Sequence, residues 1–412
     1  MLVKLKDICT IKSSKRIFEK EYVESGIPFI RGKEITDKSI LNPLGNFECY
    51  ISKERYEELK ETYGVPQIGD ILMTAVGTVG NTCYINKQID FYYKDGNVIQ
   101  FTNFSKNVNS KYLYFFFNSS LFIITLNNIL IGAVQKALTM DMLKEIEIDL
   151  PIREIQDKIA NILSNIDNQI ERNNAMTKRL QIMAQTTYSR WFNQFEFPNN
   201  EGKPYKSNGG ELVYNKELGK EIPADWNVDN LYKIASFENG LACQKYRPVN
   251  ETDKLPVIKI TEMHNGFTKE TEFCRNDVKQ KHIIENGDLL FSWSATLETQ
   301  IWCGGKGVLN QHIFNVIPKE YFSKYYVYLQ LTSYIQNFVK IAESRKTTMG
   351  HITTDHLKQS KIIIPPNDVM NKFTALTNPI YLEIINLNIE TIKLIELKEK
   401  LLPLLINGQL NI

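Results

Sequence analysis

An internal repeat is the feature that most constrains the fold of this chain. The stretch IPFIRGKEI at 27–35 returns as LPVIKITEM at 255–263, in the shared order apolar, Pro, apolar, Ile, basic, two free positions, Glu, apolar. The stretch IGDILMTAV at 68–76 returns in the same way as NGDLLFSWS at 286–294. Self-similarity has to be settled before a fold class is assigned, and these pairs predict a duplicated unit.

Two further pairs extend the repeat over most of the chain. ALTMDMLKEIEIDLP at 137–151 matches HITTDHLKQSKIIIP at 351–365, and LKDICTI at 5–11 matches LYKIASF at 231–237. The offset between matched blocks shrinks along the chain, so the first copy holds extra residues between its shared blocks. SKERYEELKETYG at 52–64 is the predicted insertion.

A helical pattern follows each copy. Apolar residues recur at alternating spacings of three and four, which is the heptad seam of a coiled coil. The seam positions are Ile155, Ile159, Ile162, Ile166, Gln169, Asn173, Met176, Leu180 and Met183 in the first stretch, and Val369, Phe373, Leu376, Ile380, Ile384, Leu387, Thr391, Leu394, Leu401 and Leu405 in the second. Each stretch predicts a helix of about 40 residues, roughly 60 Å long. Pro379 has no N–H to donate, so we expect it to kink or interrupt the second helix.

The blocks before the helices are rich in short β-branched or aromatic runs, with helical pieces between them. We therefore predict an α+β fold with two similar globular domains, joined and spaced by two long antiparallel coiled-coil helices. Such a chain has an internal pseudo-two-fold repeat. The predicted parts are a first domain at 1–150, a helix at 151–195, a linker at 196–214, a second domain at 215–365 and a helix at 366–412.

Composition limits the possible partners. The net charge is only +2, so a nucleic-acid surface has to come from local clusters of basic residues. The six cysteines lie far apart without a CxxC pair, which favours free thiols in a reducing cytoplasm over a zinc ribbon. No apolar run is long enough to span a bilayer, and the N-terminal stretch does not resemble a signal peptide. We expect a cytoplasmic protein with no membrane partner.

The middle of the chain carries a family resemblance. The stretch WFNQFEFPNNEGKPYKSNGGELV at 191–213, followed by EIPADW at 221–226, closely resembles the central region of specificity subunits of Type I restriction-modification systems. The GDIL and GDLL strands, the LP or PP step that closes each domain and the paired long helices are similar too. One departure is visible, because the first copy starts directly at MLVKLKD without an IPADW stretch before it.

This resemblance implies two target-recognition domains that each read half of an interrupted, asymmetric double-stranded DNA sequence. It also implies that the long helices dock two adenine methyltransferase subunits, and that restriction/translocase subunits join the complex. S-adenosylmethionine and ATP are then expected on those partners, with no cofactor in this chain.

Base readout selects Arg, Lys, Asn, Gln, Thr and aromatic residues on loops. The DNA-binding candidates are Lys12, Lys15, Arg16, Arg31, Lys33, Thr78, Gln135 and Lys136 in the first copy, and Lys245, Tyr246, Arg247, Lys259, Arg345, Lys346 and His351 in the second. Their clusters in KSSKR, QKYR and SRKTT can contact either phosphate or base. Trp293 lies inside the apolar run LLFSWSA, which favours a core position over base stacking.

Other polar residues lie on the predicted helices. Gln169, Asn173 and Thr391 on the seams favour a role in helix register, with contact to a third subunit as the alternative. The candidates for partner binding on the outer faces are Asn161, Asn165, Arg172, Lys178, Asn386, Glu390 and Lys393.

Two other classes of function compete with a DNA reader. A DNA adenine methyltransferase needs a D/N-P-P-Y/F/W motif, and the nearest text is PPND at 365–368, in the wrong order. The stretch GGKGV at 304–308 is too short for a phosphate-binding loop, and His351 and His356 lack metal-ligand spacing. The GD pairs at 69–70 and 287–288 are better explained as turns than as catalytic acids. The alternative to an enzyme is a coiled-coil adaptor without a DNA role, and we expect a non-catalytic reader.

Overall fold

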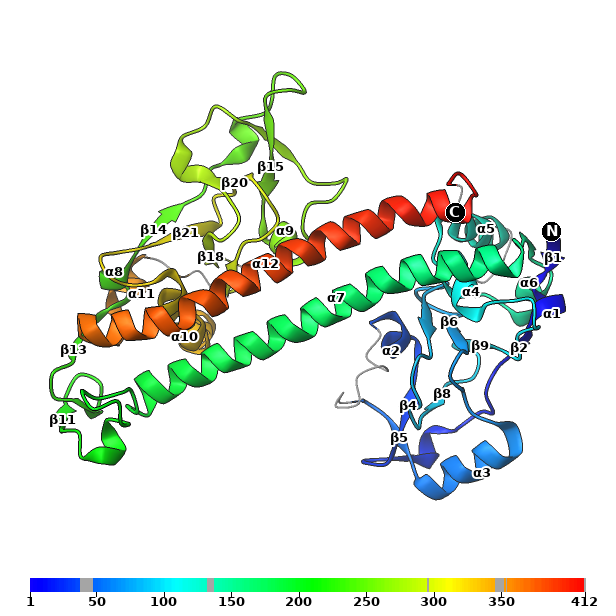
Figure 1. Ribbon diagram of the computed structural model, residues 1–412, viewed down its shortest axis with the longest axis horizontal. Coiled ribbons are helices and arrows are strands. Elements are labelled where there is room, and N and C mark those ends of the chain that lie inside the picture. The colour runs from blue at the N-terminus through cyan, green and yellow to red at the C-terminus, as the bar shows by residue number, and fades with distance from the viewer. Residues whose placement is uncertain (38–46, 132–136, 295, 345–351, 353, 411–412) are drawn as a thin grey trace. The chain divides into compact units, whose positions relative to one another are not determined.

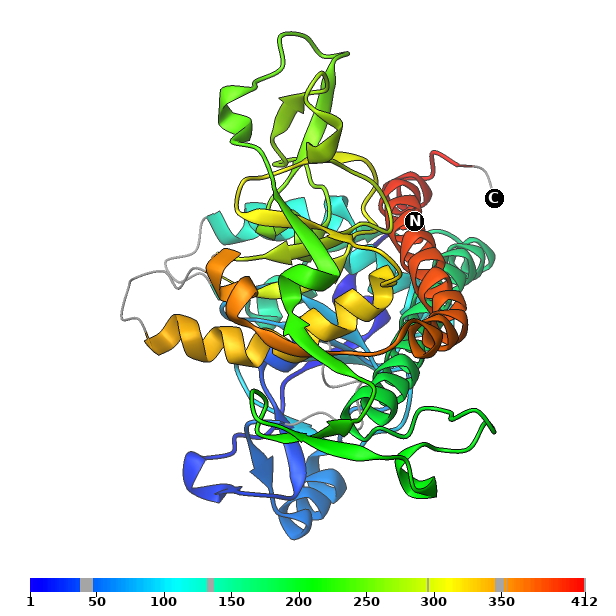
Figure 2. The same ribbon diagram turned by 90° about the vertical axis from the view of Figure 1, so that its left-hand side faces the viewer.

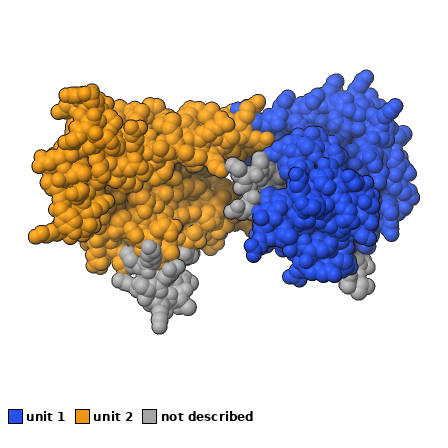
Figure 3. Space-filling model, turned by 90° about the horizontal axis from the view of Figure 1, so that it is seen from below, with its two compact units in different colours: residues 1–169, 394–412 blue, residues 170–393 orange. Residues whose placement is uncertain are grey.

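The computed structural model describes residues 1–37, 47–131, 137–294, 296–344, 352 and 354–410. The chain folds into two compact units, which Figure 3 shows in separate colours: unit 1 comprises Met1–Gln169 and Leu394–Ile412, and unit 2 comprises Ile170–Lys393. The two long helices, α7 (Arg153–Tyr188) and α12 (Asn367–Ile406), each contribute residues to both units.

The globular part of unit 1 mixes short strands and helices (Figure 1). In chain order these are β1 (Leu2–Lys4), α1 (Leu5–Ile8), β2 (Thr10–Lys12), η1 (Glu19–Glu21), β3 (Tyr22–Val23), β4 (Ile27–Ile30), α2 (Gly32–Thr36), β5 (Tyr50–Ile51), α3 (Lys53–Tyr63), β6 (Ile71–Thr74), β7 (Thr82–Tyr84), β8 (Tyr92–Tyr93), β9 (Val98–Thr102), α4 (Ser110–Phe117), α5 (Ser120–Ile131), α6 (Met140–Lys144) and β10 (Glu147–Asp149). Strands β6 and β9 are buried along their whole length, and their apolar side chains are shared between two cores. Ile71, Met73, Ile99 and Phe101 belong to one core, and Leu72 and Val98 belong to the other.

Unit 2 has a similar series of elements between the long helices. In chain order they are the π-helical turn η3 (Ser189–Asn193), η4 (Lys206–Asn208), β11 (Leu212–Asn215), β12 (Lys220–Pro223), β13 (Asn227–Asn230), α8 (Leu231–Ile234), β14 (Ala235–Asn239), η5 (Cys243–Lys245), β15 (Lys254–Ile258), α9 (Ile260–Asn265), β16 (Phe273–Arg275), η6 (Gln280–His282), β17 (Ile283–Ile284), β18 (Leu289–Ser292), β19 (Glu298–Ile301), β20 (Gly307–Leu309), β21 (Ile313–Pro318), α10 (Lys324–Ser344), α11 (Thr354–Gln359) and β22 (Lys361–Ile364).

The sheet topology confirms the duplication. Each unit has two four-stranded sheets, and the sheet with the longer strands has the order β2-β9-β6-β7 in unit 1 and the matching order β14-β21-β18-β19 in unit 2. In unit 1 β1 pairs with β10, and in unit 2 β13 pairs in the same way with β22, both antiparallel. In the smaller sheets β4 runs parallel to β8, and β15 runs parallel to β20. The α+β fold with two similar domains is therefore confirmed.

The predicted insertion at 52–64 forms helix α3. Ser52 caps its start, since the side-chain oxygen accepts from Arg55 N at 3.2 Å, and Gly64 ends it with a φ of 73°. Between β16 and β18, the described part of unit 2 has only η6 and β17 in this place.

In unit 1, α7 and α12 lie side by side and run in opposite directions. Lys398 Nζ on α12 donates to Asp167 Oδ1 on α7 at 2.5 Å. Further along, Leu405 on α12 is buried in the same core as Ile159 and Leu163 on α7.

In unit 2, the other halves of the two helices pair in the same antiparallel sense. Asn173 Nδ2 on α7 donates to Glu390 Oε2 on α12 at 3.1 Å, although Asn173 is buried. The ring centroids of Tyr188 and Phe373 lie 6.5 Å apart. The bond from Asn173 supports a role of this residue in helix register.

Two details of the helix prediction are wrong. The predicted seam positions Met176, Met183 and Leu376 are 45%, 48% and 50% exposed. A straight helix has 3.6 residues per turn, so a strict heptad set drifts off the inner face. Buried Gln156 and Ala184 take inner positions that the heptad pattern misses.

Of the two effects expected at Pro379, a kink or an interruption, the interruption is wrong, because α12 continues through it. An interior proline costs about 3 kcal/mol. The side chains of Phe373, Ile380 and Ile384 around it are buried in the core of unit 2. Each contributes about 1.5–3 kcal/mol by burial, and together they outweigh the lost backbone bond.

The stretch after α7 is ordered although it has no sequence periodicity (Figure 1, Figure 2). The rings of Phe197 and Tyr205 stack at 4.6 Å, and Phe197 lies 5.0 Å from Trp226. Phe195 and Trp226 are buried with α7 residues in the core of unit 2. Aromatic packing therefore holds this segment, including the hairpin β11–β12, on unit 2.

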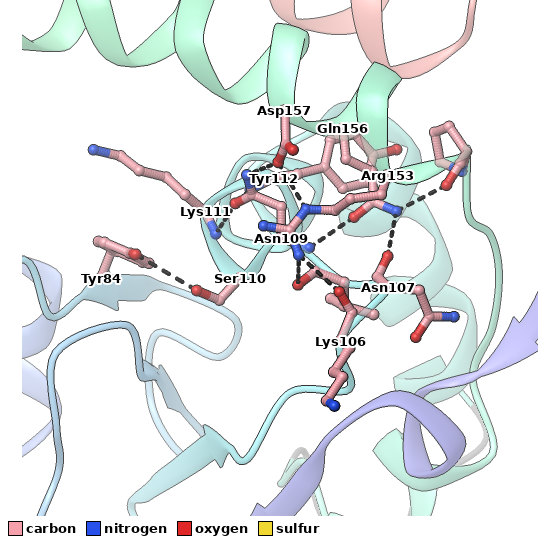
Figure 4. Close-up of polar contacts among 12 residues, drawn as sticks. Tyr84, Lys106, Asn107, Asn109, Ser110, Lys111, Tyr112, Arg153, Gln156 and Asp157 are labelled. Carbon is pink, nitrogen blue, oxygen red and sulfur yellow. Dashed lines mark hydrogen bonds and ion pairs between the residues drawn. The ribbon is translucent and has the colours of Figure 1, made fainter.

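A polar junction fixes the start of α7 to the globular part of unit 1 (Figure 4). Asn109 caps α4 by accepting from Lys111 N and Tyr112 N. Its own N–H donates to Gln156 Oε1 at 2.8 Å, and its Nδ2 donates to Asp157 Oδ1 at 2.6 Å. The cap of one helix is thus held by the first turns of the other.

Among the described residues, no single helix is long and apolar enough to cross a membrane. Helices α4 and α5 reach that length and composition only when taken together, and they are bent by 64° relative to each other.

Candidate nucleic-acid interface

The repeated motif builds the same local structure twice. In unit 1, Arg31 precedes α2, and Glu34 Oε2 accepts from Arg31 N at 2.9 Å. In unit 2, Lys259 precedes α9, and Glu262 Oε2 accepts from Lys259 N at 3.1 Å. Both glutamates are buried, so they cap a helix that starts directly after a strand. The repeated glutamate is structural, and the basic side chain before it is partly exposed.

Each basic side chain belongs to a cluster of two cations and one carboxylate. We call Arg31, Lys33 and Glu48 cluster 1, and Arg247, Lys259 and Glu272 cluster 2.

In cluster 1, Glu48 bridges both cations: it pairs with Arg31 Nη2, and its Oε1 accepts from Lys33 Nζ at 2.6 Å. The hydrogen bonds from Lys33 and Arg31 lower the pKa of Glu48 to about 2. The carboxylate therefore stays ionised at neutral pH.

In cluster 2, Glu272 plays the corresponding part. Its Oε1 lies 2.7 Å from Lys259 Nζ, and its Oε2 lies 3.3 Å from Arg247 Nη1. Lys259, followed by Arg247, lowers the pKa of Glu272. Tyr246 directly precedes Arg247 of this cluster, and its ring centroid lies 5.5 Å from the guanidinium of Arg275.

Thr78 lies close to cluster 1. Its hydroxyl oxygen is 3.0 Å from that of Thr36 at the end of α2, and Asn81 Nδ2 donates to Thr36 Oγ1 at 3.1 Å. Gly77 and Gly80 turn this loop with φ values of 77° and 91°. Helix α2 thus has cluster 1 at its start and a polar loop at its end.

The KSSKR segment forms a second basic surface in unit 1, along a hollow of about 270 Å³ beside Tyr63 and Tyr92. Lys12 Nζ donates to the Tyr63 carbonyl oxygen at 3.2 Å, and Lys15 Nζ lies 5.5 Å from the Tyr63 ring centroid. Arg16 Nε donates to Asp95 at 2.8 Å.

Lys245 ends η5 in unit 2 and is exposed.

Five of the predicted DNA-binding residues lie outside the residues that the structure describes. These are Gln135, Lys136, Arg345, Lys346 and His351.

Three other predictions concern residues that the structure describes. Trp293 packs against the core of unit 2, 5.9 Å from Phe314 between ring centroids, which supports the core interpretation. Asp70 and Asp288 accept from the backbone N–H groups of Gln67 and Glu285, so the GD pairs are turns that lead into buried strands.

All six cysteines are free, and burial raises the pKa of Cys9 and of Cys243 to about 12. Cys9 and Cys243 are therefore protonated thiols of the interior. No group of three His, Cys, Asp or Glu able to hold a metal ion occurs in the described part of the chain.

The seven predicted partner-binding residues are exposed on the long helices. Asn161 and Asn165 belong to unit 1, and Arg172, Lys178, Asn386, Glu390 and Lys393 belong to unit 2. Glu390 also accepts the bond from Asn173, so one of its oxygens already serves the pairing of the helices.

Sequence reasoning missed the two glutamates that complete the clusters. Glu48 lies 17 residues after Arg31, and it reaches Arg31 because β5 pairs with β4. Glu272 lies directly before β16, which pairs with β15. A prediction of strand pairing would have been needed to find either residue.

Comparison with known proteins places this geometry in context. The chain matches the family described as Type I restriction modification DNA specificity domain over residues 1–182 and again over 223–395. It is 26% identical to the Type I restriction enzyme MjaIX specificity subunit of Methanocaldococcus jannaschii, over 99% of this chain and 93% of that protein. It is 22% identical to the Type I restriction enzyme HindI specificity subunit of Haemophilus influenzae, over 66% of this chain and 71% of that protein.

A solved structure shares the fold. The Type I restriction-modification system S subunit from M. genitalium aligns with a TM-score of 0.61 at 12% identity, over 98% of this chain and 95% of that one.

Proposed function

Because this chain belongs to the family of Type I restriction modification DNA specificity domains, we propose that it selects the DNA sequence on which a Type I restriction-modification complex acts. It is a recognition component without a catalytic role, like the specificity subunits that it resembles. In this proposal residues 1–150 and 215–365 are target-recognition domains for double-stranded DNA, 151–195 and 366–412 are spacer helices, and 196–214 links the two halves.

The proposed target is bipartite and asymmetric, with an unread gap between its halves. The observation that carries this proposal is the duplicated cluster, present once in each unit after the equivalent strand. Cluster 1 uses Arg31 where cluster 2 uses Lys259, and their second cations come from different segments. Two similar scaffolds with different contact residues suit two different half-sites.

The proposed partners are two adenine methyltransferase subunits on the long helices, together with restriction/translocase subunits. The repeat supports two copies, since a duplicated chain offers two related surfaces to one kind of partner. S-adenosylmethionine and ATP would then be bound by those partners. Native mass spectrometry of the co-expressed proteins should give one copy of this chain with two methyltransferases, and a complex that never adds a second copy would contradict this stoichiometry.

Methylome sequencing of cells that carry this chain and its methyltransferase tests the readout. We expect one methylated motif with two different halves around an unread gap. A continuous palindromic motif would contradict the proposal. A binding titration at two salt concentrations is the control, because phosphate contacts make DNA affinity fall with salt whatever sequence is read.

A further inference from the structure

The glutamates of the two clusters have an unexpected chemistry for a DNA-binding surface. Glu48 and Glu272 are 54% and 41% exposed, and they precede the strands β5 and β16, which pair with β4 and β15. The two carboxylates are not at equivalent positions of the repeat, since Cys49 in unit 1 takes the place of Glu272 opposite the repeated strand. Each nevertheless pairs with the basic residue that directly follows that strand, Arg31 or Lys259. Among the residues that the structure describes, Glu48 accepts hydrogen bonds from the two cations of its own cluster.

A phosphate site does not explain this carboxylate. An ionised carboxylate only accepts hydrogen bonds, and phosphate oxygens also only accept, so the glutamate would repel the DNA backbone. The major groove is different, because each base pair presents one exocyclic amino group there, N4 of cytosine or N6 of adenine. The same edges present acceptors beside the amino group, which match the donors of Arg and Lys.

We propose that Glu48 and Glu272 are specificity-determining residues, each reading one base pair in the half-site of its own domain. The carboxylate accepts from the exocyclic amino group of cytosine or adenine, and the Arg and Lys of its cluster donate to the acceptors on the same edge. The two cations that lower the pKa of Glu48 also hold its carboxylate beside their own donors, so acceptor and donors are presented together. This inference rests on the proposed function, since it assumes that both domains contact DNA.

Unit 1 offers a matched control for this idea. Glu145 also bridges two cations, Lys4 at 2.7 Å and Lys6 at 2.6 Å, and is 55% exposed. Its pKa is likewise lowered to about 2 by hydrogen bonds from the two lysines. In the matched block of unit 2, Gln359 stands at the corresponding position, so this bridge is not repeated.

The test compares Glu48→Ala, Glu272→Ala and Glu145→Ala in the full chain co-expressed with its methyltransferase. The methylated motif is read from duplexes with randomised sequence. Glu48→Ala should lower discrimination at one base pair of one half-site by about five- to a hundredfold, and Glu272→Ala should do so in the other half. Glu145→Ala should leave the motif unchanged, and all three variants should still unfold cooperatively, with thermal midpoints within a few degrees of wild type because the ion pairs are exposed.

Glu48→Gln then separates the two amino groups. Glutamine suits adenine, so the variant should shift a cytosine position towards adenine and keep an adenine position as it is. The inference is overturned if Glu48→Ala and Glu272→Ala leave the motif unchanged and strengthen binding to every sequence, because the glutamates would then only weaken non-specific binding. It is also overturned if Glu145→Ala relaxes the motif equally. A wild-type complex without any sequence preference would instead refute the proposed function.

Discussion

The buried amide of Gln156 should hold unit 1 to the start of α7. Its Oε1 accepts from Asn109 N at 2.8 Å, and its Nε2 donates to the carbonyl oxygens of Asn107 at 3.0 Å and Pro151 at 2.8 Å. The side chain is 0% exposed. Gln156→Met keeps a side chain of similar length and removes all three hydrogen bonds. The N–H of Asn109 and the carbonyl oxygens of Asn107 and Pro151 then lose Gln156 as a partner.

The loss should be large for a single substitution. A buried polar group that loses its partner costs about 1–3 kcal/mol, and the apolar methionine offsets part of this, so we expect a loss of about 3 kcal/mol in the free energy of unfolding. In a domain of 150–250 residues, 1 kcal/mol corresponds to about 2–4 °C. Calorimetry of the full chain should therefore show the transition of unit 1 about 6–12 °C lower.

Glu154→Met provides the control on the same turn of α7, where the side chain is exposed. This change should move the midpoint by no more than about 2 °C. If Gln156→Met shifts the transition no more than Glu154→Met does, the three bonds do not hold the junction.

Three further outcomes are expected. The stability difference between wild type and Glu48→Gln should be constant above pH 4.5, the ordinary pKa of a glutamate, and should disappear as the pH falls towards about 2. At that pH Glu48 becomes protonated in the folded chain as well as in the unfolded chain. Thermal midpoints measured from pH 7 to pH 2 test this. Replacing 215–365 with the second domain of a relative should change one half of the methylated motif, and a change in both halves would contradict independent readers. A fragment of residues 1–195 should aggregate or dimerise, which light scattering would detect, and a soluble monomer would contradict the pairing of α7.

The repeat made most of the fold predictable. Blocks such as IPFIRGKEI determine their local structure by themselves, since Glu34 caps the helix that follows the strand. Glu262 caps the corresponding helix in unit 2 in the same way. Fold class, duplication and antiparallel helices follow from such local signals kept in one order.

Features that depend on pairing across the chain were not predictable. Glu48 and Glu272 reach their cations only through strand pairing, and neither belongs to a repeated motif. The segment after α7 has no periodicity, and its order depends on tertiary contacts such as those of Phe197 with Tyr205 and Trp226. The heptad pattern failed at Met176, where packing follows the drift of a straight helix.

The division of α12 between the units has a consequence for biosynthesis. Unit 2 is continuous in sequence, whereas the core of unit 1 includes Leu405, which is made more than two hundred residues after Ile159 and Leu163. Domains generally fold as they leave the ribosome, N-terminal parts first. Here unit 2 can complete its fold before unit 1 does. Until the last part of α12 has been made, unit 1 exposes the apolar face of α7 to solvent. We therefore expect chaperones to bind unit 1 of nascent chains that are stalled before residue 394.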